Sequence, residues 1–320
     1  MMQFYKKRDF GTFISDSFSF FKFYGKNYFK GYTLINGFLL ILMVVITIIG
    51  YRELFLQLMG SNLSGESYYF EQYFSENTGM LILVGFLLFL LFSAVSIVSY
   101  LYPVFYMKRL TEGKTDIKTD EILGDFKKNA KKIIIYYLGM MFVVMPLCII
   151  VILISYVLIL ILIGIVLMLF VFPFIFNFIT FLSYDYFNTD KGFFESMGYA
   201  MRAQFSYDNK RENSPFWKYW GATIINFLIY NIITSIFTMI PMMFFYAALL
   251  TNTSSGDFEQ NPLTGTFGIV IFIIYGVSLL VSFILMNLLY VNSGLMYYDS
   301  RTDLHQKMEF AEIETIGVNE

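Results

Sequence analysis

Lysine residues recur at helical spacing near the start of the chain, and they are the first candidates for binding chemistry. Lys22, Lys26 and Lys30 stand four residues apart, so they form one stripe on a helix. At a membrane surface, such a stripe can contact the phosphates of anionic lipid headgroups. An ordinary solvated helix face packed on the protein has the same pattern, so both interpretations stay open.

A second basic cluster lies further along the chain. It contains Lys127, Lys128, Lys131 and Lys132. The apolar residues Ile122 and Phe126 precede these lysines at helical spacing, which again indicates an amphipathic helix. We predict lipid headgroup contact for this cluster as well.

Residues for catalysis or metal binding are scarce. The sole histidine, His305, lies in the polar carboxy-terminal segment, and the sole cysteine, Cys148, lies within an apolar run. A catalytic base needs partners in an organised pocket, and one cysteine allows neither an internal disulfide nor a cysteine cluster. The sequence contains no Walker A motif, zinc-binding helix motif or nucleophile elbow. We therefore expect no catalytic site, no cofactor and no metal.

The composition indicates that these residues are positioned by membrane helices. Of 320 residues, 57% are hydrophobic and 14% are charged, and the mean hydropathy is +0.62. A soluble domain of this size carries far more charge. The net charge of -2 argues against nucleic acid as a partner, because neutralising phosphates requires a surplus of Lys and Arg.

Six apolar segments are long enough to span a bilayer, which takes about 20 residues. The predicted spans are residues 32–51, 79–107, 133–153, 158–183, 219–247 and 267–290. Residues 133–184 contain no charge or histidine, and as one helix they would be about 78 Å long, so they must fold back as a hairpin. We place its turn near Ser155 and Tyr156, with Gly164 as the other candidate.

The basic residues predict the orientation. With the amino terminus inside, 21 of the 22 Lys and Arg residues fall in cytoplasmic segments, and only Arg52 falls outside. Both termini are then cytoplasmic, including the segment 299–320. The composition is typical of a bacterial protein, so the bacterial inner membrane is the expected location.

Each pair of spans follows a segment that reads as an amphipathic helix. The first is residues 9–30, the second is residues 120–132, and the third begins at Thr189 or Asp190. The predicted fold is all-α: a polytopic integral membrane bundle of six helices in three hairpins, each preceded by a cytoplasmic interfacial helix. We expect the whole chain, residues 1–320, to be one membrane domain.

Short motifs in the second half resemble those of a known family. Ser196, Ala200 and Arg202 match a pattern between spans four and five, and Trp217 follows at the start of the fifth span. Near the carboxy terminus stands a Tyr-Tyr-Asp-x-Arg sequence: Tyr297, Tyr298, Asp299 and Arg301. This set resembles the six-helix bacterial membrane proteins related to the membrane domain of glycerophosphoryl diester phosphodiesterases. Met201 departs from the pattern, which usually has an aromatic residue there.

The resemblance implies a membrane domain without the enzyme's activity. The catalytic histidines of that phosphodiesterase have no counterpart in a chain whose only histidine is His305. We expect a non-enzymatic scaffold or accessory protein that binds anionic lipid and a cytoplasmic or membrane protein partner. The alternative is a transporter or channel for a small neutral solute or a lipid, because asparagines such as Asn177, Asn226 and Asn287 lie within the spans.

Overall fold

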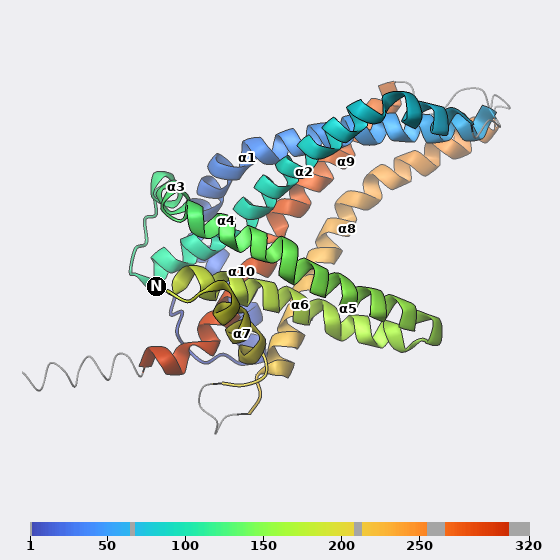
Figure 1. Ribbon diagram of the computed structural model, residues 1–320. Helices are drawn as coiled ribbons and strands as arrows, with labels where there is room; N and C mark the ends of the chain where they lie inside the picture. The colour runs from blue at the N-terminus through green and yellow to red at the C-terminus, as the bar shows by residue number, and fades with distance from the viewer. Residues whose placement is uncertain (1, 65–67, 208–212, 255–265, 307–320) are drawn as a thin grey trace, which may run out of the picture. The chain divides into compact units, whose positions relative to one another are not determined.

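Helices make up nearly all of the regular structure (Figure 1). The computed structural model describes residues 2–64, 68–207, 213–254 and 266–306, and these contain no strand. The helices are α1 (Phe10–Ser64), α2 (Tyr68–Thr111), α3 (Thr119–Lys128), α4 (Ala130–Gly139), α5 (Met145–Val157), α6 (Ile163–Asn188), α7 (Phe193–Ala203), α8 (Phe216–Ser254), α9 (Thr266–Leu285) and α10 (Asn287–Ser300). A π-helical turn joins α4 to α5. The predicted all-helical class is confirmed.

Six helical stretches among the described residues are long and apolar enough to cross a membrane, as predicted. They are Phe10–Gly50, Ser75–Thr111, Ala130–Leu160, Ile163–Asn188, Phe216–Ile240 and Ile269–Ser300. Large apolar side chains lie on their surfaces, and Ile149, Leu153 and Ile163 of α5 and α6 are each more than half exposed. Such surfaces suit contact with lipid chains. The helices therefore fit a multi-pass membrane protein.

The start of α1 differs from the predicted boundaries. Residues 9–30 and 32–51 were expected as an interfacial helix and a separate span, but one helix runs from Phe10 to Ser64. This stretch has no proline, and Gly31 alone does not interrupt the helical hydrogen bonds. The prediction of two separate helices is wrong. The interfacial position of the first part of α1 stays a prediction.

The hairpin between α5 and α6 turns at neither of the two predicted positions. α5 continues through Ser155 and Tyr156, and a 3₁₀ turn over Leu158–Ile161 follows it. Leu162 then adopts a left-handed backbone with φ of 63°, and α6 begins at Ile163. Gly164 has a different role: a Cβ atom there would collide with the backbone of Ser155 and Ile159.

The segment predicted to be cytoplasmic, residues 299–320, begins in the buried part of unit 1. Asp299 is fully buried and Arg301 is half-buried. Asp299 tolerates burial because hydrogen-bond donors surround it, as described below. Residues 307–320 lie outside the described part of the chain.

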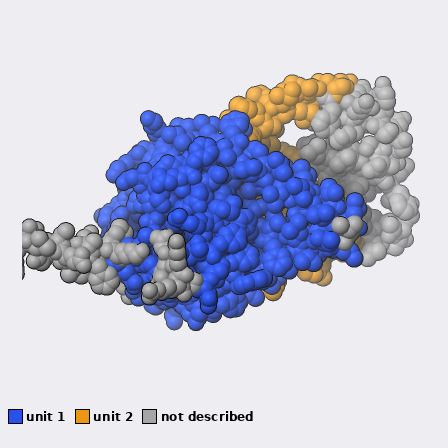
Figure 2. All heavy atoms as spheres, turned by 60° about the horizontal axis from the view of Figure 1, so that its bottom comes forward, with its two compact units in different colours: residues 1–35, 99–228, 287–320 blue, residues 36–98, 229–286 orange. Residues whose placement is uncertain are grey.

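The chain divides into two compact units, which Figure 2 shows in different colours. Unit 1 comprises residues 1–35, 99–228 and 287–320, and unit 2 comprises residues 36–98 and 229–286. Within unit 2, Ile48 packs against Ile271 and Phe272, and the Ser278 hydroxyl donates to the Phe237 carbonyl at 2.8 Å. Unit 1 contains the polar groups from which the candidate site is built.

Tyrosines dominate the core of unit 1. Tyr28, Tyr102, Tyr106, Tyr184, Tyr219, Tyr297 and Tyr298 are all almost completely buried. Buried tyrosine hydroxyls need partners, and here they connect helices. The Tyr102 hydroxyl donates to the Tyr28 carbonyl at 2.6 Å, and the Tyr28 hydroxyl donates to Asn287 at 2.7 Å. These bonds join α1, α2 and α10.

Candidate functional site

Asp299, near the end of α10, is the centre of a buried polar network in unit 1. Its carboxylate accepts hydrogen bonds from the Tyr219 hydroxyl at 2.6 Å and the Tyr207 hydroxyl at 3.0 Å. The Lys218 ammonium approaches to 2.9 Å, and the backbone N–H of Arg8 donates at 2.6 Å. Four donor groups thus stabilise one carboxylate that is 0% exposed.

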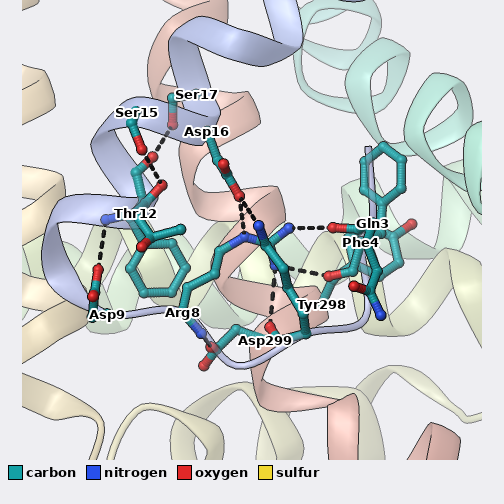
Figure 3. A network of polar contacts seen from close by, with 12 residues as sticks. Gln3, Phe4, Arg8, Asp9, Thr12, Ser15, Asp16, Ser17, Tyr298 and Asp299 are labelled. Carbon is teal, nitrogen blue, oxygen red and sulfur yellow. Dashed lines mark hydrogen bonds and ion pairs between the residues drawn. The ribbon is translucent and has the colours of Figure 1, made fainter. Parts of the chain in front are cut away.

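Arg8 fixes the amino-terminal segment to this network, as Figure 3 shows. Its guanidinium donates to the carbonyls of Gln3 and Phe4, each at 2.7 Å, and to Asp16 at 2.9 Å. Burial lowers the pKa of Arg8, and the hydrogen bond from Arg8 to Asp16 partly offsets that effect. The pKa of an arginine is high enough for Arg8 to remain charged. The segment before α1 is therefore held by a paired, buried cation.

The first turn of α1 begins beside Arg8 for a local reason. Asp9 precedes the helix, and its carboxylate accepts a hydrogen bond from the Thr12 backbone N–H at 2.7 Å (Figure 3). Aspartate is among the preferred residues at this position because it satisfies a free N–H group of the first turn. Hydrogen bonds from the side chain and the backbone of Thr12 lower the pKa of Asp9.

Asp185, near the end of α6, forms a second buried ion pair. The carboxylate is 0% exposed and lies 2.9 Å from Arg301 and 3.2 Å from Lys191. The Arg301 guanidinium also lies over the Tyr199 ring, 5.4 Å from its centroid. Asp185 and Asp299 each have cationic partners, whose attraction offsets the desolvation cost of burying a carboxylate.

A basic cavity of about 450 Å³ lies elsewhere in unit 1. The end of α2, the junction of α3 and α4 and the end of α6 form it. Its basic lining residues are Lys108, Arg109, Lys114, Lys128 and Lys132, and its acidic lining residues are Glu112, Asp125 and Asp190. A cavity of this size can hold a small ligand, and the excess of cations favours an anionic one.

The predicted lipid-contact lysines differ in their surroundings. Lys22, Lys26, Lys30, Lys127, Lys128 and Lys131 are exposed. None of these six forms a hydrogen bond or ion pair with a residue in the described part of the chain. Lys132 differs, because it is half-buried and donates to the Thr189 carbonyl at 2.8 Å. Lys128 and Lys132 line the cavity, whereas the three lysines of α1 do not.

The family-like positions fall into three groups. Ser196 and Ala200 are buried on the inner face of α7, and Tyr297 and Tyr298 lie in the tyrosine core. Asp299 and Arg301 belong to the ion pairs. Arg202 and Trp217 are exposed and lie outside the network. The motifs therefore contain core residues, ion-pair residues and surface residues, and the sequence similarity alone does not distinguish among them.

Several residues of these sites, including Arg8, Lys108 and Tyr207, were not singled out as site residues from the sequence. Arg8 and Lys108 were counted only as cytoplasmic charges, and Tyr207 lies between the third predicted amphipathic helix and the fifth predicted span. Their partners lie 291, 79 and 92 residues away along the chain. No local pattern reports contacts at such separations. One usable signal is the presence of both basic and acidic residues at the predicted cytoplasmic ends of several helices. Such residues can pair with each other even when they are far apart along the chain.

Uncharged polar groups also meet inside the apolar helices of unit 1. Asn177 of α6 accepts hydrogen bonds from Thr223 of α8 and Ser293 of α10, each at 2.9 Å. Asn226 and Asn292 are fully buried. Among the described residues, no three His, Cys, Asp or Glu side chains gather closely enough to hold a metal ion.

Comparison with known proteins gives one partial match. Residues 192–318 match the family described as "Protein of unknown function (DUF4013)", which covers less than half of the chain. No curated protein and no solved structure matches. The matched segment includes Lys218, Asp299 and Arg301, whereas Arg8 and Asp185 lie before it.

Proposed function

We propose that the protein is a non-enzymatic scaffold or accessory protein of a bacterial inner membrane. In this proposal it binds anionic lipid through its lysine-rich helices and a protein partner on the cytoplasmic side. The observation that carries the proposal is the stripe of Lys22, Lys26 and Lys30 on α1. All three are exposed, and their ammonium groups have no ion-pair partner among the described residues, so they are available to lipid phosphates.

The orientation with both termini in the cytoplasm belongs to the same proposal. Arg8, Asp185, Lys218 and Asp299 come from four segments whose charges assign them to the cytoplasmic side. Arg8 and Lys218 both contact Asp299, and Asp185 contacts Arg301, which lies 116 residues away along the chain. Segments that share ion pairs must lie on one side of the membrane, which supports the charge-based orientation.

The buried carboxylates support a structural role. Asp185 and Asp299 are held by cations and hydroxyls, so their oxygens serve to join helices. The sequence motifs resemble those of six-helix bacterial membrane proteins related to the membrane domain of a phosphodiesterase. This resemblance fits the proposal, because it implies a membrane domain without the enzyme's activity. The exposed apolar side chains of Phe194 and Met201 on α7 suit a helix that lies in the membrane interface.

Purification in mild detergent, with bound lipids and proteins identified by native mass spectrometry, tests this function. The wild type is compared with K22Q/K26Q/K30Q and with a variant that lacks residues 307–320. Truncation after residue 306 spares Arg301, whose loss would break the pair with Asp185. K118Q is the charge control, because Lys118 is exposed and lies outside both lysine groups.

The expected result is a stoichiometric protein partner together with anionic lipid. The triple lysine variant should retain less anionic lipid than the wild type, and the truncated variant should lose the partner. Copurification of neither partner nor anionic lipid with the wild type would contradict the proposal.

The second candidate is a transporter or channel for a small neutral solute or a lipid. The buried set of Asn177, Thr223 and Ser293 favours it, because polar groups within apolar helices can line a path. Purified protein in liposomes should then accelerate glycerol-driven swelling or lipid exchange between leaflets, and N177L should abolish that activity. Protein-free liposomes provide the background rate.

A further inference from the structure

The basic cavity of unit 1 contains cations that the protein itself does not neutralise. Arg109 is satisfied, since it lies 2.6 Å from Asp125 and 3.1 Å from Glu121. Lys114 also contacts Glu121, at 3.3 Å. Lys108, Lys128 and Lys132 form no ion pair with any residue between positions 2 and 306 that the structure describes.

Lys108 and Lys132 converge on the end of α6. The Lys108 ammonium donates to the Phe187 carbonyl at 3.1 Å, and the Lys132 ammonium donates to the Thr189 carbonyl at 2.8 Å. A helix carboxy terminus is equivalent to a charge of about -0.5, so two ammonium groups more than compensate it. Each ammonium has three N–H donors, and one carbonyl bond uses only one of them.

The remaining lining identifies the kind of anion. Lys128 is exposed at the cavity and has no bond to a described residue that would restrain it. Glu112 and Asp190 also line the cavity and are exposed. Ammonium groups suit a phosphoryl group, and carboxylates suit hydroxyl donors. A ligand that carries both groups matches this lining better than a bare phosphate does.

We propose that this cavity binds a hydroxyl-bearing phosphate ester of the phosphoglycerol type. Lys108, Lys128 and Lys132 hold its phosphoryl oxygens, and Glu112 and Asp190 accept hydrogen bonds from its hydroxyls. The inference deepens the proposed function, on which it rests, by naming a specific headgroup site in addition to the exposed stripe of α1. The phosphoglycerol group can belong to a phosphatidylglycerol lipid or to free glycerol phosphate.

Binding is measured on the full chain in two arms. In the first, native mass spectrometry counts the lipids retained from nanodiscs of phosphatidylglycerol or of phosphatidylcholine, whose headgroup has the phosphodiester but no hydroxyl or N–H donor. In the second, calorimetry titrates sn-glycerol 3-phosphate and inorganic phosphate into protein held in phosphatidylcholine nanodiscs. Retention in the first arm alone identifies the lipid as the source, and binding in the second identifies the free ester.

Two sets of variants locate the site. K128E changes a side chain with no described protein contact, so it should weaken binding at least about tenfold, as expected for loss of a charge-assisted hydrogen bond, without altering thermal unfolding. K108Q/K132Q should weaken binding further, and its unfolding temperature is measured alongside because both lysines contact the end of α6. K22Q/K26Q/K30Q is the matched control and should keep the cavity ligand.

Three outcomes would overturn the cavity proposal. In the first, the protein retains the two lipids equally and binds no glycerol phosphate. In the second, K128E and K108Q/K132Q leave binding unchanged. In the third, only the α1 variant K22Q/K26Q/K30Q removes phosphatidylglycerol binding. The third outcome would leave the proposed function intact. A different outcome would contradict the proposed function and keep the cavity site. In that outcome every variant retains as much anionic lipid as the wild type, and glycerol phosphate still binds at the cavity.

Discussion

At the scale of single residues, Asp299 shows how a polar residue can be central to an apolar protein. The sequence analysis placed Tyr297, Tyr298, Asp299 and Arg301 in one motif, and it placed Asp299 at the start of the predicted cytoplasmic segment 299–320. The structure buries it against Arg8, Tyr207, Lys218 and Tyr219. Those partners come from three other segments of the chain, so no local pattern could predict them.

Replacing Asp299 by asparagine should strongly destabilise the protein. The D299N side chain has one acceptor oxygen instead of two, and its amide N–H groups would face existing donors. Lys218 would lose the negative charge of Asp299, which lies 2.9 Å from its ammonium group. Breaking a buried pair in this way costs about 3 kcal/mol, which denaturant unfolding in detergent can measure.

D303N is the matched control for that experiment. Asp303 pairs with Lys7 at 2.9 Å, but both side chains are partly exposed. The expected loss is less than about 1 kcal/mol, the range measured for surface ion pairs. Equal losses in D299N and D303N would mean that the Asp299 network does not hold unit 1 together.

At the scale of elements, the apolar hairpin of α5 and α6 shows that sequence can predict the presence of a turn but not its position. The length of the uncharged run requires a turn, but a turn within apolar sequence has no polar residue to mark it. The structure places it where Leu162 adopts φ of 63° and Gly164 allows close backbone contact. For α1, the sequence correctly indicated helix on both sides of Gly31, and only continuity was missed.

The turn leads to a prediction about two neighbouring substitutions with opposite effects. G164A should destabilise the hairpin by about 1–3 kcal/mol, because the new methyl group overlaps the Ser155 carbonyl and the Ile159 backbone. L162G should be neutral or stabilise the protein by up to about 1 kcal/mol, because glycine adopts a left-handed backbone without strain. Thermal unfolding of both variants provides the comparison.

G124A is the control for the alanine substitution. A Cβ atom at Gly124 of α3 would meet nothing within 4 Å. Alanine favours a helix interior over glycine by about 1 kcal/mol, so G124A should raise the unfolding temperature. A rise for G164A as well would show that the hairpin turns elsewhere.

At the scale of the whole molecule, charge and hydropathy predicted the number of spans, but they could not predict the division into two units. Hydropathy depends on local composition, whereas the units join residues from opposite ends of the sequence. The polar contacts of unit 1 depend on tyrosine, asparagine and single charges that carry little hydropathy signal. The basic cavity likewise depends on the end of α6, where Phe187 lies 79 residues from Lys108 and Thr189 lies 57 residues from Lys132 along the chain.

The orientation, which the charges predict and the ion pairs support, can be tested by labelling single cysteines in intact cells. In a C148S background, S75C lies in a predicted outer segment and T115C in a predicted cytoplasmic loop; both positions are exposed. A membrane-impermeant maleimide should label S75C in intact cells and T115C only after permeabilisation. The opposite orientation is strongly disfavoured, because it would move 21 of the 22 basic residues away from the anionic cytoplasmic leaflet to the outside. Labelling of T115C in intact cells would invert the orientation and place the lysine stripe of α1 outside the cell, where the proposed cytoplasmic partner could not reach it.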